Sequence, residues 1–370
     1  MDFDFNDEQK MLRDQAQKFL EDKCPRDVPR AVLESEDGYD KNLWSGLAEM
    51  GFLGAAIPEE FGGLGLGHLE LCVIAEELGR SLAPVPVASS IYLCAEGLLI
   101  AGSDEQKSSW LPKLASGEAI GTMAVSEGNR PASAKNLETR FEGGKLNGRK
   151  IPVPDGAIAD VAIVIAASEK GTAAVLVDLN GDGVSREVVR TMDPSRPQAI
   201  VEFKDAPAEL LGNDGEGWDI KEQIYDRAAI LIAFEQVGGS TAAIEMAKEY
   251  AQDRIAFGRQ IASFQAIKHK LADMYVKTEL ARSHAYYGAW ALSTNAPELP
   301  VAAAGARSAA CDAYYFTSKE NIQTHGGVGF TWEMDCHLFY RRAKQLNLVI
   351  GSGRYWKDKL ITQLEKRNAA

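Results

Sequence analysis

The sequence predicts a mainly α-helical chain with a central β domain. Long segments near the C-terminal end have the length and alanine content of helices that pack into a bundle. Short segments rich in Val, Ile and Ala fill the middle of the chain and are typical of strands. The first part has apolar residues at helical spacing. We therefore expect a helical domain at 1–120, a β domain at 121–218 and a helical bundle at 219–370.

The N-terminal domain is predicted to contain several short helices. Asn6 is followed by two acidic residues, which is the pattern of a helix cap, and apolar residues recur behind it at helical spacing. A second helix is expected to stop at Gly51, because glycine readily adopts the left-handed conformation that ends many helices. A third helix is expected at 69–80.

The β domain is predicted from four segments with the composition of strands. They read GTMAVSE, DVAIVIAAS, TAAVLVDL and QAIVEFKDA. Asn-Gly and Gly-Asp-Gly sequences, which are typical of tight turns, stand among them. We expect this domain to end near GNDGEGW, where a helical pattern resumes.

The C-terminal domain is predicted to consist of long helices at 225–254, 262–292 and 300–327. Their Ala- and Gly-rich faces allow close approach of helices, within the chain or between subunits. The last helix runs into NIQTHGGVGF, where Gly326 and Gly327 are adjacent. Glycine permits positive φ and close approach of another body, so this segment marks a turn or a ligand contact.

Charge and composition argue against several classes of protein. The 45% hydrophobic and 25% charged content is ordinary for a globular protein, and a net charge of −13 argues against a nucleic-acid partner. We find no signal-peptide pattern and no apolar run long enough for a membrane span. Five scattered cysteines without a CxxC pair support neither a zinc site nor a disulfide framework. We expect a cytoplasmic protein with reduced thiols and no metal.

Three stretches carry a family resemblance: IPEEFGGLGLG, YAQDRIAFGRQIASFQAIKHKLADM and NIQTHGGVGFTWEMDCHLFYRRAK. Together they resemble the acyl-CoA dehydrogenase family of flavoproteins, including the branch with subunits of heterotetrameric bacterial enzymes. The resemblance covers nearly the whole chain. It implies an N-terminal helical domain, a middle β-barrel or sandwich and a C-terminal four-helix bundle. It also implies FAD as cofactor and a homo- or heterotetramer in which a neighbouring subunit completes the FAD site.

The resemblance assigns a set of residues to FAD. Arg254 matches the arginine on the diphosphate, Phe257 the aromatic at the flavin edge, and Gln265 the glutamine on the adenosine side. A fork of charged donors suits a diphosphate, although Arg254 taken alone would be a solvated residue at a helix end. QTHGG matches the segment whose backbone approaches the diphosphate and ribityl chain. The other implied contacts are Val125, Ser126, Val153, Gln323, Thr324, Gly326, Gly327 and Ser352.

The sequence departs from the family pattern at three places. VSEGNRPAS stands where the family has Ser/Thr-Glu-Pro followed by Gly-Ser-Asp, and KIPVPDGA replaces a stretch with Trp and Thr beside the flavin. Ile350 occupies the position at which the family commonly has its catalytic glutamate, and isoleucine cannot accept a proton. Some branches carry the base on the first long helix of the C-terminal domain, and others are hetero-oligomers in which one chain type lacks it.

Asp226 and Glu235 are the candidate bases on that first long helix. Asp226 precedes Arg227 in a pair that resembles the acid–arginine pair of the helix-based branch, and Arg227 is the expected substrate contact. Glu235 lies in apolar AAILIAFEQVGG, where burial favours a carboxyl group that accepts a proton near neutral pH. Its structural alternative is an acid that is paired with a buried arginine or caps a neighbouring helix. The two acids are nine residues apart (235 − 226), on opposite faces of a straight helix, and we prefer Glu235.

The resemblance implies FAD-dependent α,β-dehydrogenation of an acyl-CoA thioester to a trans-2-enoyl-CoA, in fatty-acid or steroid side-chain β-oxidation. Electrons would leave through an electron-transferring flavoprotein. The alternative, which Ile350 and the altered β-domain loop favour, is a non-catalytic subunit that completes the FAD site of a heterotetramer. An acyl-CoA binder without flavin fits the FAD-matching residues poorly.

Overall fold

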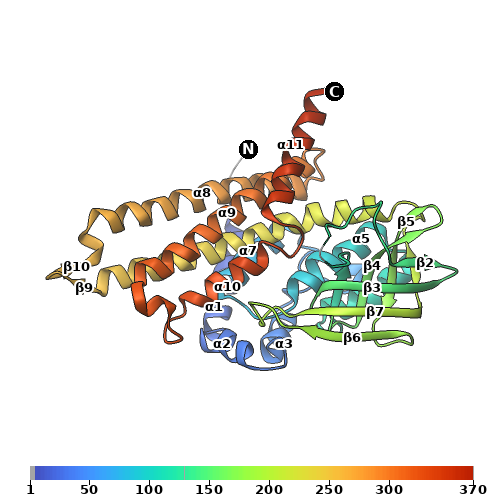
Figure 1. The fold of residues 1–370 in the computed structure, drawn as a ribbon, viewed down its shortest axis with the longest axis horizontal. Helices are drawn as coiled ribbons and strands as arrows, with labels where there is room; N and C mark the ends of the chain where they lie inside the picture. Colours follow the sequence, from blue (N-terminus) through green and yellow to red (C-terminus); the bar gives the residue numbers. More distant parts are fainter. Residues whose placement is uncertain (1–4, 129, 370) are drawn as a thin grey trace. The chain divides into compact units, whose positions relative to one another are not determined.

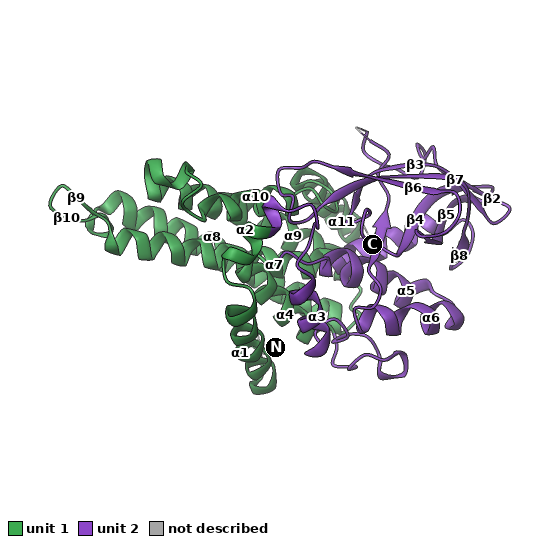
Figure 2. Cartoon of the chain, turned by 90° about the horizontal axis from the view of Figure 1, so that it is seen from below, with its two compact units in different colours: residues 1–31, 68–83, 229–370 green, residues 32–67, 84–228 purple. Residues whose placement is uncertain are grey.

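The computed structural model describes residues 5–128 and 130–369. These residues form two compact units, each assembled from separate parts of the chain (Figure 2). Unit 1 contains residues 1–31, 68–83 and 229–370, and unit 2 contains residues 32–67 and 84–228. The unit boundary near residue 228 falls inside one long helix, α7 (Gly217–Asp253).

Unit 1 consists almost entirely of helices (Figure 1). Besides most of α7, its helices are α1 (Asp7–Lys23), α4 (His68–Ser81), α8 (Gln265–Ser293), α9 (Leu299–His325), α10 (Cys336–Leu346) and α11 (Gly353–Ala369). Short elements join them: β9 (Ile255–Ala256), β10 (Arg259–Gln260), η3 (Ile261–Ser263) and η4 (Gly326–Phe330). Helix α2 (Asp27–Glu34) crosses from unit 1 into unit 2.

The first helix begins at the cap that the sequence predicts. The Asn6 side chain accepts a hydrogen bond from the Gln9 amide at 2.8 Å, and the Gln9 side chain accepts one from the Asn6 amide at 3.0 Å. This reciprocal capping box satisfies two amides at a helix end, where the helix itself supplies no acceptor. The cap therefore fixes where α1 starts.

Glycines allow the long helices of unit 1 to pack at very short distances. A Cβ atom at Gly79 of α4 would lie 1.9 Å from the Glu235 carbonyl oxygen of α7, and one at Gly238 would lie 1.8 Å from the Glu76 carbonyl oxygen. The backbones of α4 and α7 are thus in direct contact at this crossing. The predicted close approach of Gly-rich helix faces is confirmed here, and it places Glu235 inside the core of unit 1.

Unit 2 packs helices with a β-sheet. Its helical elements are α3 (Lys41–Glu49), η1 (Glu59–Phe61), η2 (Ala88–Ala95), α5 (Glu96–Ala101) and α6 (Asp104–Ala115). Helix α3 ends where the sequence predicts, because Gly51 adopts a left-handed conformation with φ +74°. The Phe52 amide then donates a hydrogen bond to the Leu47 carbonyl oxygen at 3.0 Å.

The sheet of unit 2 has eight strands. They are β1 (Gly121–Ala124), β2 (Arg140–Glu142), β3 (Lys145–Pro154), β4 (Val161–Ser168), β5 (Gly171–Asp178), β6 (Val184–Val189), β7 (Gln198–Pro207) and β8 (Glu209–Leu211). The order is β6-β7-β3-β2-β4-β5-β8, with β1 parallel to β4. β4 and β5 form a regular antiparallel hairpin whose apolar side chains are largely buried.

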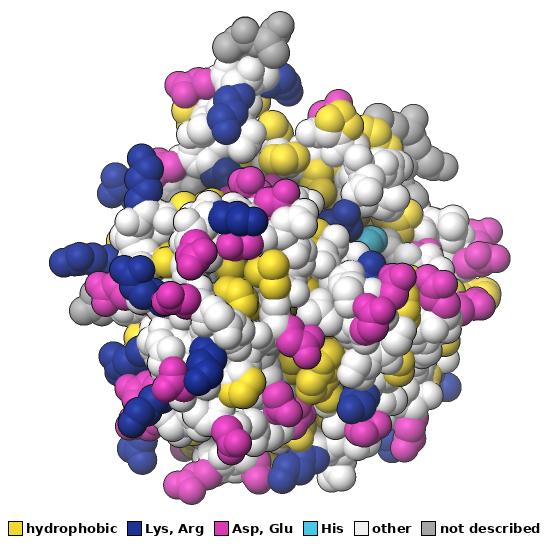
Figure 3. Space-filling view, turned by 90° about the vertical axis from the view of Figure 1, so that its right-hand side faces the viewer, with side chains coloured by type: hydrophobic (Ala, Val, Ile, Leu, Met, Phe, Trp, Pro, Cys, Tyr) yellow, Lys and Arg dark blue, Asp and Glu magenta, His cyan; other side chains and the backbone are white. Residues whose placement is uncertain are grey.

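The predicted fold class is confirmed: helices precede and follow a middle sheet. On the face shown in Figure 3, acidic and basic side chains are interspersed. Within the described parts of the chain, no helix is long and apolar enough to cross a membrane.

Candidate functional site

Arg254, Phe257 and Gln265 lie on a single connection, the hairpin between α7 and α8 (Figure 1). Arg254 directly follows α7, and the Ile261 amide closes the hairpin by donating to the Arg254 carbonyl at 2.8 Å. Gln265 is the first residue of α8. All three side chains are exposed, so the hairpin presents them outward from unit 1.

Phe257 has an unusual conformation at the tip of this hairpin. Phe257 and Gly258 both have positive φ, +53° and +77°, as the two central residues of a tight hairpin turn require. A bulky residue rarely adopts positive φ, and such strain clusters at functional positions. The Phe257 side chain is also 95% exposed. We interpret the strained, exposed ring as a contact for a group outside the chain.

The segment QTHGG forms the end of α9 and the turn after it. The Gln323 side chain is exposed, whereas Thr324 is buried and its hydroxyl donates to the Glu320 carbonyl at 2.7 Å. Gly326 ends the helix with φ +66°, which only glycine adopts easily. A Cβ atom at Gly326 or Gly327 would meet no described heavy atom within 4 Å. Open space therefore lies beside both glycines.

His325, which precedes the glycines, is held firmly in place. Its ring stacks on Tyr250 with centroids 4.1 Å apart, and Nδ1 lies 2.9 Å from the Asn321 carbonyl oxygen, to which it donates. Burial lowers the pKa of His325, so the ring is neutral at pH 7 and Nε2 carries a lone pair. Nε2 is buried and has no hydrogen-bond partner among the described residues.

Val125, Ser126 and Val153 lie together in unit 2. The Ile151 amide donates to the Ser126 carbonyl at 2.8 Å, and the Gly128 amide donates to the Ile151 carbonyl at 2.9 Å. The segment after β1 therefore runs beside β3. Val125 and Val153 are buried, and Ser126 is half-buried.

The first candidate base, Asp226, is a buried residue of unit 2. It is 5% exposed. Its neighbour Arg227 forms an ion pair with Glu96 of α5, which is 2% exposed, at 3.6 Å. Glu96 could not be predicted as the partner of Arg227, because 131 residues (227 − 96) separate the two in the chain.

The second candidate base, Glu235, is completely buried in unit 1 and lies near a buried arginine, Arg307 of α9. Arg307 donates to the Gln236 side chain and to the Leu346 carbonyl oxygen. Burial lowers the pKa of Arg307, and the Cys311 thiol and the Glu235 carboxylate act against that shift. The geometry thus supplies the buried arginine that the structural alternative for Glu235 requires.

Comparison with known proteins identifies the family. The family model for the acyl-CoA dehydrogenase N-terminal domain matches residues 6–118, and the family model for the acyl-CoA dehydrogenase C-terminal domain matches residues 215–358. The chain is 34% identical over 338 residues to the acyl-CoA dehydrogenase IpdE2 of Mycobacterium tuberculosis, covering 91% of each chain. The chain belongs to the acyl-CoA dehydrogenase family. It is an oxidoreductase of this family.

Solved structures of acyl-CoA dehydrogenases have the same fold. The acyl-CoA dehydrogenase complexed with FAD from Bacillus anthracis has a TM-score of 0.91 at 25% identity, covering 99% of this chain and 68% of that one. The ChsE4-ChsE5 complex from Mycobacterium tuberculosis has a TM-score of 0.89 at 26% identity, covering 99% of both chains. The family binds FAD, and FAD is the cofactor of this chain.

The residues present fit FAD. Arg254 and Gln265 offer exposed charged and amide donors for a diphosphate and a nucleoside. The open space beside Gly326 and Gly327 leaves room for a ligand against their backbone. The lone pair on His325 Nε2 can accept a hydrogen bond from a ligand hydroxyl. These features support the proposed assignment of the hairpin and QTHGG to FAD.

The loop after α10 carries Ile350 where the family commonly has its glutamate. Ile350 is 1% exposed, so its apolar side chain is part of the core of unit 1. The half-buried Ser352 accepts a hydrogen bond from the Tyr355 amide at 3.3 Å and so caps α11. Ser352 therefore has a structural role, and its contact with FAD stays a prediction.

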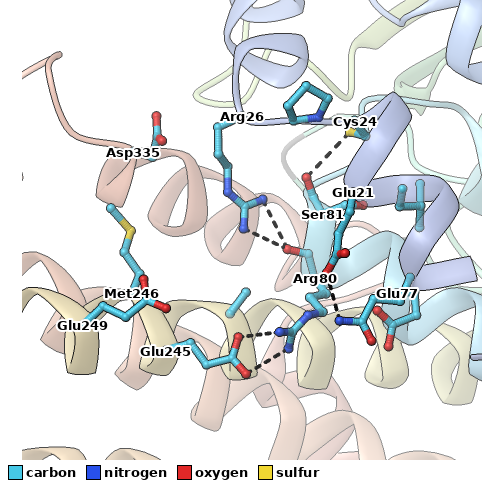
Figure 4. Close-up of a pocket in the computed structure, with 14 residues that line it drawn as sticks. Glu21, Cys24, Arg26, Glu77, Arg80, Ser81, Glu245, Met246, Glu249 and Asp335 are labelled. Atoms are coloured by element: carbon cyan, nitrogen blue, oxygen red, sulfur yellow. Dashed lines mark hydrogen bonds and ion pairs between the residues drawn. The ribbon is translucent and has the colours of Figure 1, made fainter. Parts of the chain in front are cut away.

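One cavity of unit 1 lies apart from every predicted site residue. It has a volume of about 410 Å³ and is lined by α1 and the three residues after it, by α4, by α7 and by Asp335 (Figure 4). Much of its charge is paired internally: Arg80 makes a two-pronged contact with Glu245 at 3.1 and 2.6 Å. Arg26 donates to the Arg80 carbonyl. Glu77 is the most deeply buried acid of this cavity, at 5% exposed.

Replacing Glu77 by Gln is expected to change how stability depends on pH. Burial raises the pKa of Glu77 to about 7, so the folded protein keeps the proton that the unfolded chain releases above its ordinary pKa. The wild type should therefore lose stability as pH rises from 5.5 to 7, by about 2 kcal/mol relative to Glu77→Gln. Thermal unfolding of both proteins at pH 5.5 and 8 measures this difference.

The exposed Glu249 on the same cavity provides a matched control, because Glu249→Gln removes an acid that is exposed to water and does not contribute to the pKa shift of Glu77. The stability of this control variant should change between pH 5.5 and 8 by the same amount as the stability of the wild type. Equal pH responses of Glu77→Gln and wild type would contradict the assignment of a near-neutral titration to Glu77.

Proposed function

We propose that this chain catalyses FAD-dependent α,β-dehydrogenation of an acyl-CoA thioester to a trans-2-enoyl-CoA. The observation that carries the proposal is the exposed α7–α8 hairpin, in which Arg254, Phe257 and Gln265 occur at the positions expected for FAD contacts. The strained conformation of Phe257 supports a functional role, because its side chain is 95% exposed and so makes little packing contact that would repay the strain.

In this proposal a carboxylate of α7 removes the α-proton of the thioester. Glu235 is our preferred base, and Asp226 is the alternative. Bound FAD supplies the acceptor for the β-hydride. The chain orients the thioester and excludes water from the reacting carbons, and Arg227 is the proposed substrate contact. The Arg227–Glu96 ion pair would hold that arginine at a fixed position.

The reaction is tested by its product. The purified protein should convert an acyl-CoA from a panel of straight-chain, branched and steroid thioesters into a product two hydrogens lighter, with an artificial electron acceptor present. Mass spectrometry of the thioester measures this change. We infer that an electron-transferring flavoprotein is the acceptor in the cell.

We infer that the assembly is a tetramer or a dimer of dimers. The FAD-matching residues of the hairpin are exposed in the single chain, which suits a site completed by a second subunit. Light scattering of the flavin-loaded protein should give about four times the 40.2 kDa of one chain. A flavin-loaded species of 40.2 kDa would contradict this prediction.

A second candidate function is a non-catalytic subunit that completes the FAD site of a different chain. Ile350 favours it, because the position of the family's common base is filled by a buried apolar side chain. Under this alternative the isolated chain would lack turnover, and adding the catalytic partner chain would restore it. The two candidate functions are distinguished by replacing acidic residues of this chain. Activity should be lost if this chain is catalytic and kept if the partner chain carries the base.

A further inference from the structure

Unit 2 contains a buried ion pair that the proposed reaction does not use. The Lys150 side chain of β3 has no exposed surface, and its ammonium donates to Glu127 Oε1 at 2.6 Å and to the Val125 carbonyl oxygen at 3.0 Å. Burial lowers the pKa of Lys150 to about 8, against which Glu127 acts, so the ammonium remains charged at pH 7. A buried charge is costly unless it is paired and hydrogen-bonded, so this pair must be well satisfied.

Glu127 has the partners that such burial demands. Besides Lys150, its carboxylate accepts hydrogen bonds from the Glu138 amide at 2.6 Å and from the Thr139 amide at 3.0 Å. Burial raises the pKa of Glu127, but the hydrogen bonds from Lys150, Glu138 and Thr139 outweigh it and leave the pKa below its ordinary value. The Glu127 carboxylate therefore links residue 127 to residues 138 and 139, and its ion pair with Lys150 links this group to β3.

The ion pair fixes the backbone next to the proposed flavin contacts. The Lys150 ammonium donates a hydrogen bond to the Val125 carbonyl oxygen, and the Ile151 amide donates one to the Ser126 carbonyl oxygen at 2.8 Å. The Gly128 amide completes the attachment by donating to the Ile151 carbonyl. The Ser126 hydroxyl makes no hydrogen bond to another described residue and remains available to a ligand.

We propose that Lys150 and Glu127 are positioning residues that hold the segment Val125–Gly128 in the conformation that contacts the flavin ring. The inference rests on the proposed function. Lys150 fixes the backbone at Val125, and Glu127 holds the Lys150 ammonium in place through its own hydrogen bonds to the Glu138 and Thr139 amides.

Lys150→Met is the primary test, because it removes the ammonium and keeps a chain of similar length. We expect the affinity of the apoprotein for FAD to fall by about 10-fold or more, as the loss of charged hydrogen bonds implies. The fine structure of the flavin absorption band and the flavin reduction potential should also shift, because the segment at Val125 would move. Titration of apoprotein with FAD and potentiometry measure these changes.

The control is Arg149→Met at the next position of β3. Arg149 is exposed and forms a surface ion pair with Glu202 at 3.3 Å, so its loss removes a charge without a buried partner. FAD affinity and flavin spectrum should stay within about twofold of wild type, because surface ion pairs contribute little. Glu127→Gln is the companion variant, and it should lower FAD affinity and shift the flavin spectrum as Lys150→Met does, because it removes the counter-charge of Lys150.

Several results would decide against the proposal. A folded Lys150→Met protein, as judged by circular dichroism, with wild-type FAD affinity, spectrum and reduction potential would overturn it. If Lys150→Met fails to fold, the isosteric Glu127→Gln decides instead: unchanged FAD affinity and an unchanged flavin spectrum would overturn the proposal. Failure of the wild type itself to bind FAD would contradict the proposed function. This result differs from those that would overturn the positioning role of Lys150 and Glu127, so the two proposals are tested separately.

Discussion

Arg254→Ala is expected to lower the affinity of the protein for FAD by about 10- to 100-fold, because a charged donor to the diphosphate contributes about 1.5–3 kcal/mol. Arg254 is exposed at the start of the α7–α8 hairpin, so the change should leave the fold intact. The measurements are flavin content after purification and titration of apoprotein with FAD. Arg367→Ala removes an exposed arginine from the last turn of α11 and should bind FAD as the wild type does.

Gly327→Val provides an independent steric test of the same site. Unlike Gly326, Gly327 does not have positive φ, and a Cβ there meets no described atom within 4 Å, so valine should fit the chain itself. It would instead occupy the space proposed for the diphosphate and ribityl chain. Gly326→Val should also lose flavin, but through backbone strain as well, because its φ is +66°. Full flavin occupancy in both Arg254→Ala and Gly327→Val would refute the assigned site.

Glu235→Gln is expected to reduce turnover by about 100- to 10,000-fold while the flavin spectrum is unchanged, because the loss of a general base has effects of this size. Asp226→Asn should retain most of the activity. The measurement is steady-state reduction of an artificial electron acceptor by acyl-CoA, together with the visible spectrum. Gln has the shape of Glu, so the α4–α7 crossing beside residue 235 should survive.

The structural alternative for Glu235 predicts a different pattern. If Glu235 serves only as the counter-charge of Arg307, Glu235→Gln should lower the melting temperature and leave turnover per flavin nearly unchanged. Loss of turnover in Asp226→Asn alone would identify Asp226 as the base. Normal turnover in both variants would place the base on another chain and favour the non-catalytic subunit.

The sequence predicted those structural elements that depend on residues close together in the chain. The cap at Asn6 and the stop at Gly51 depend on residues within a few positions, and both occur in the structure. The apolar strands β4 and β5 were also predicted, because their side chains are buried along most of their length. The sequence was less informative for β3, where exposed and buried residues alternate and register shifts follow Leu146 and Lys150.

Two long-range contacts near the predicted sites, one ion pair and one hydrogen bond to a backbone carbonyl, could not be derived from spacing. Lys150 and Glu127 are 23 residues apart, and Arg307 and Leu346 are 39 residues apart, so only the fold brings each pair together. A weak signal was present at Arg307, a lone charge in the Ala-rich segment AAAGARSAAC of a predicted bundle helix. A charge at such a position is either exposed or paired, and the sequence does not distinguish these cases.

The most direct test of the central claim is an anaerobic titration of the purified chain with acyl-CoA, followed by its visible spectrum. We expect a yellow, FAD-containing protein whose flavin absorption bleaches as an acyl-CoA of the correct class is added, with an enoyl-CoA formed in equal amount. Bleaching should persist in Asp226→Asn and disappear in Glu235→Gln. A protein that binds FAD but shows no bleaching with any acyl-CoA, alone or as a tetramer, would contradict the proposed dehydrogenase activity of this chain.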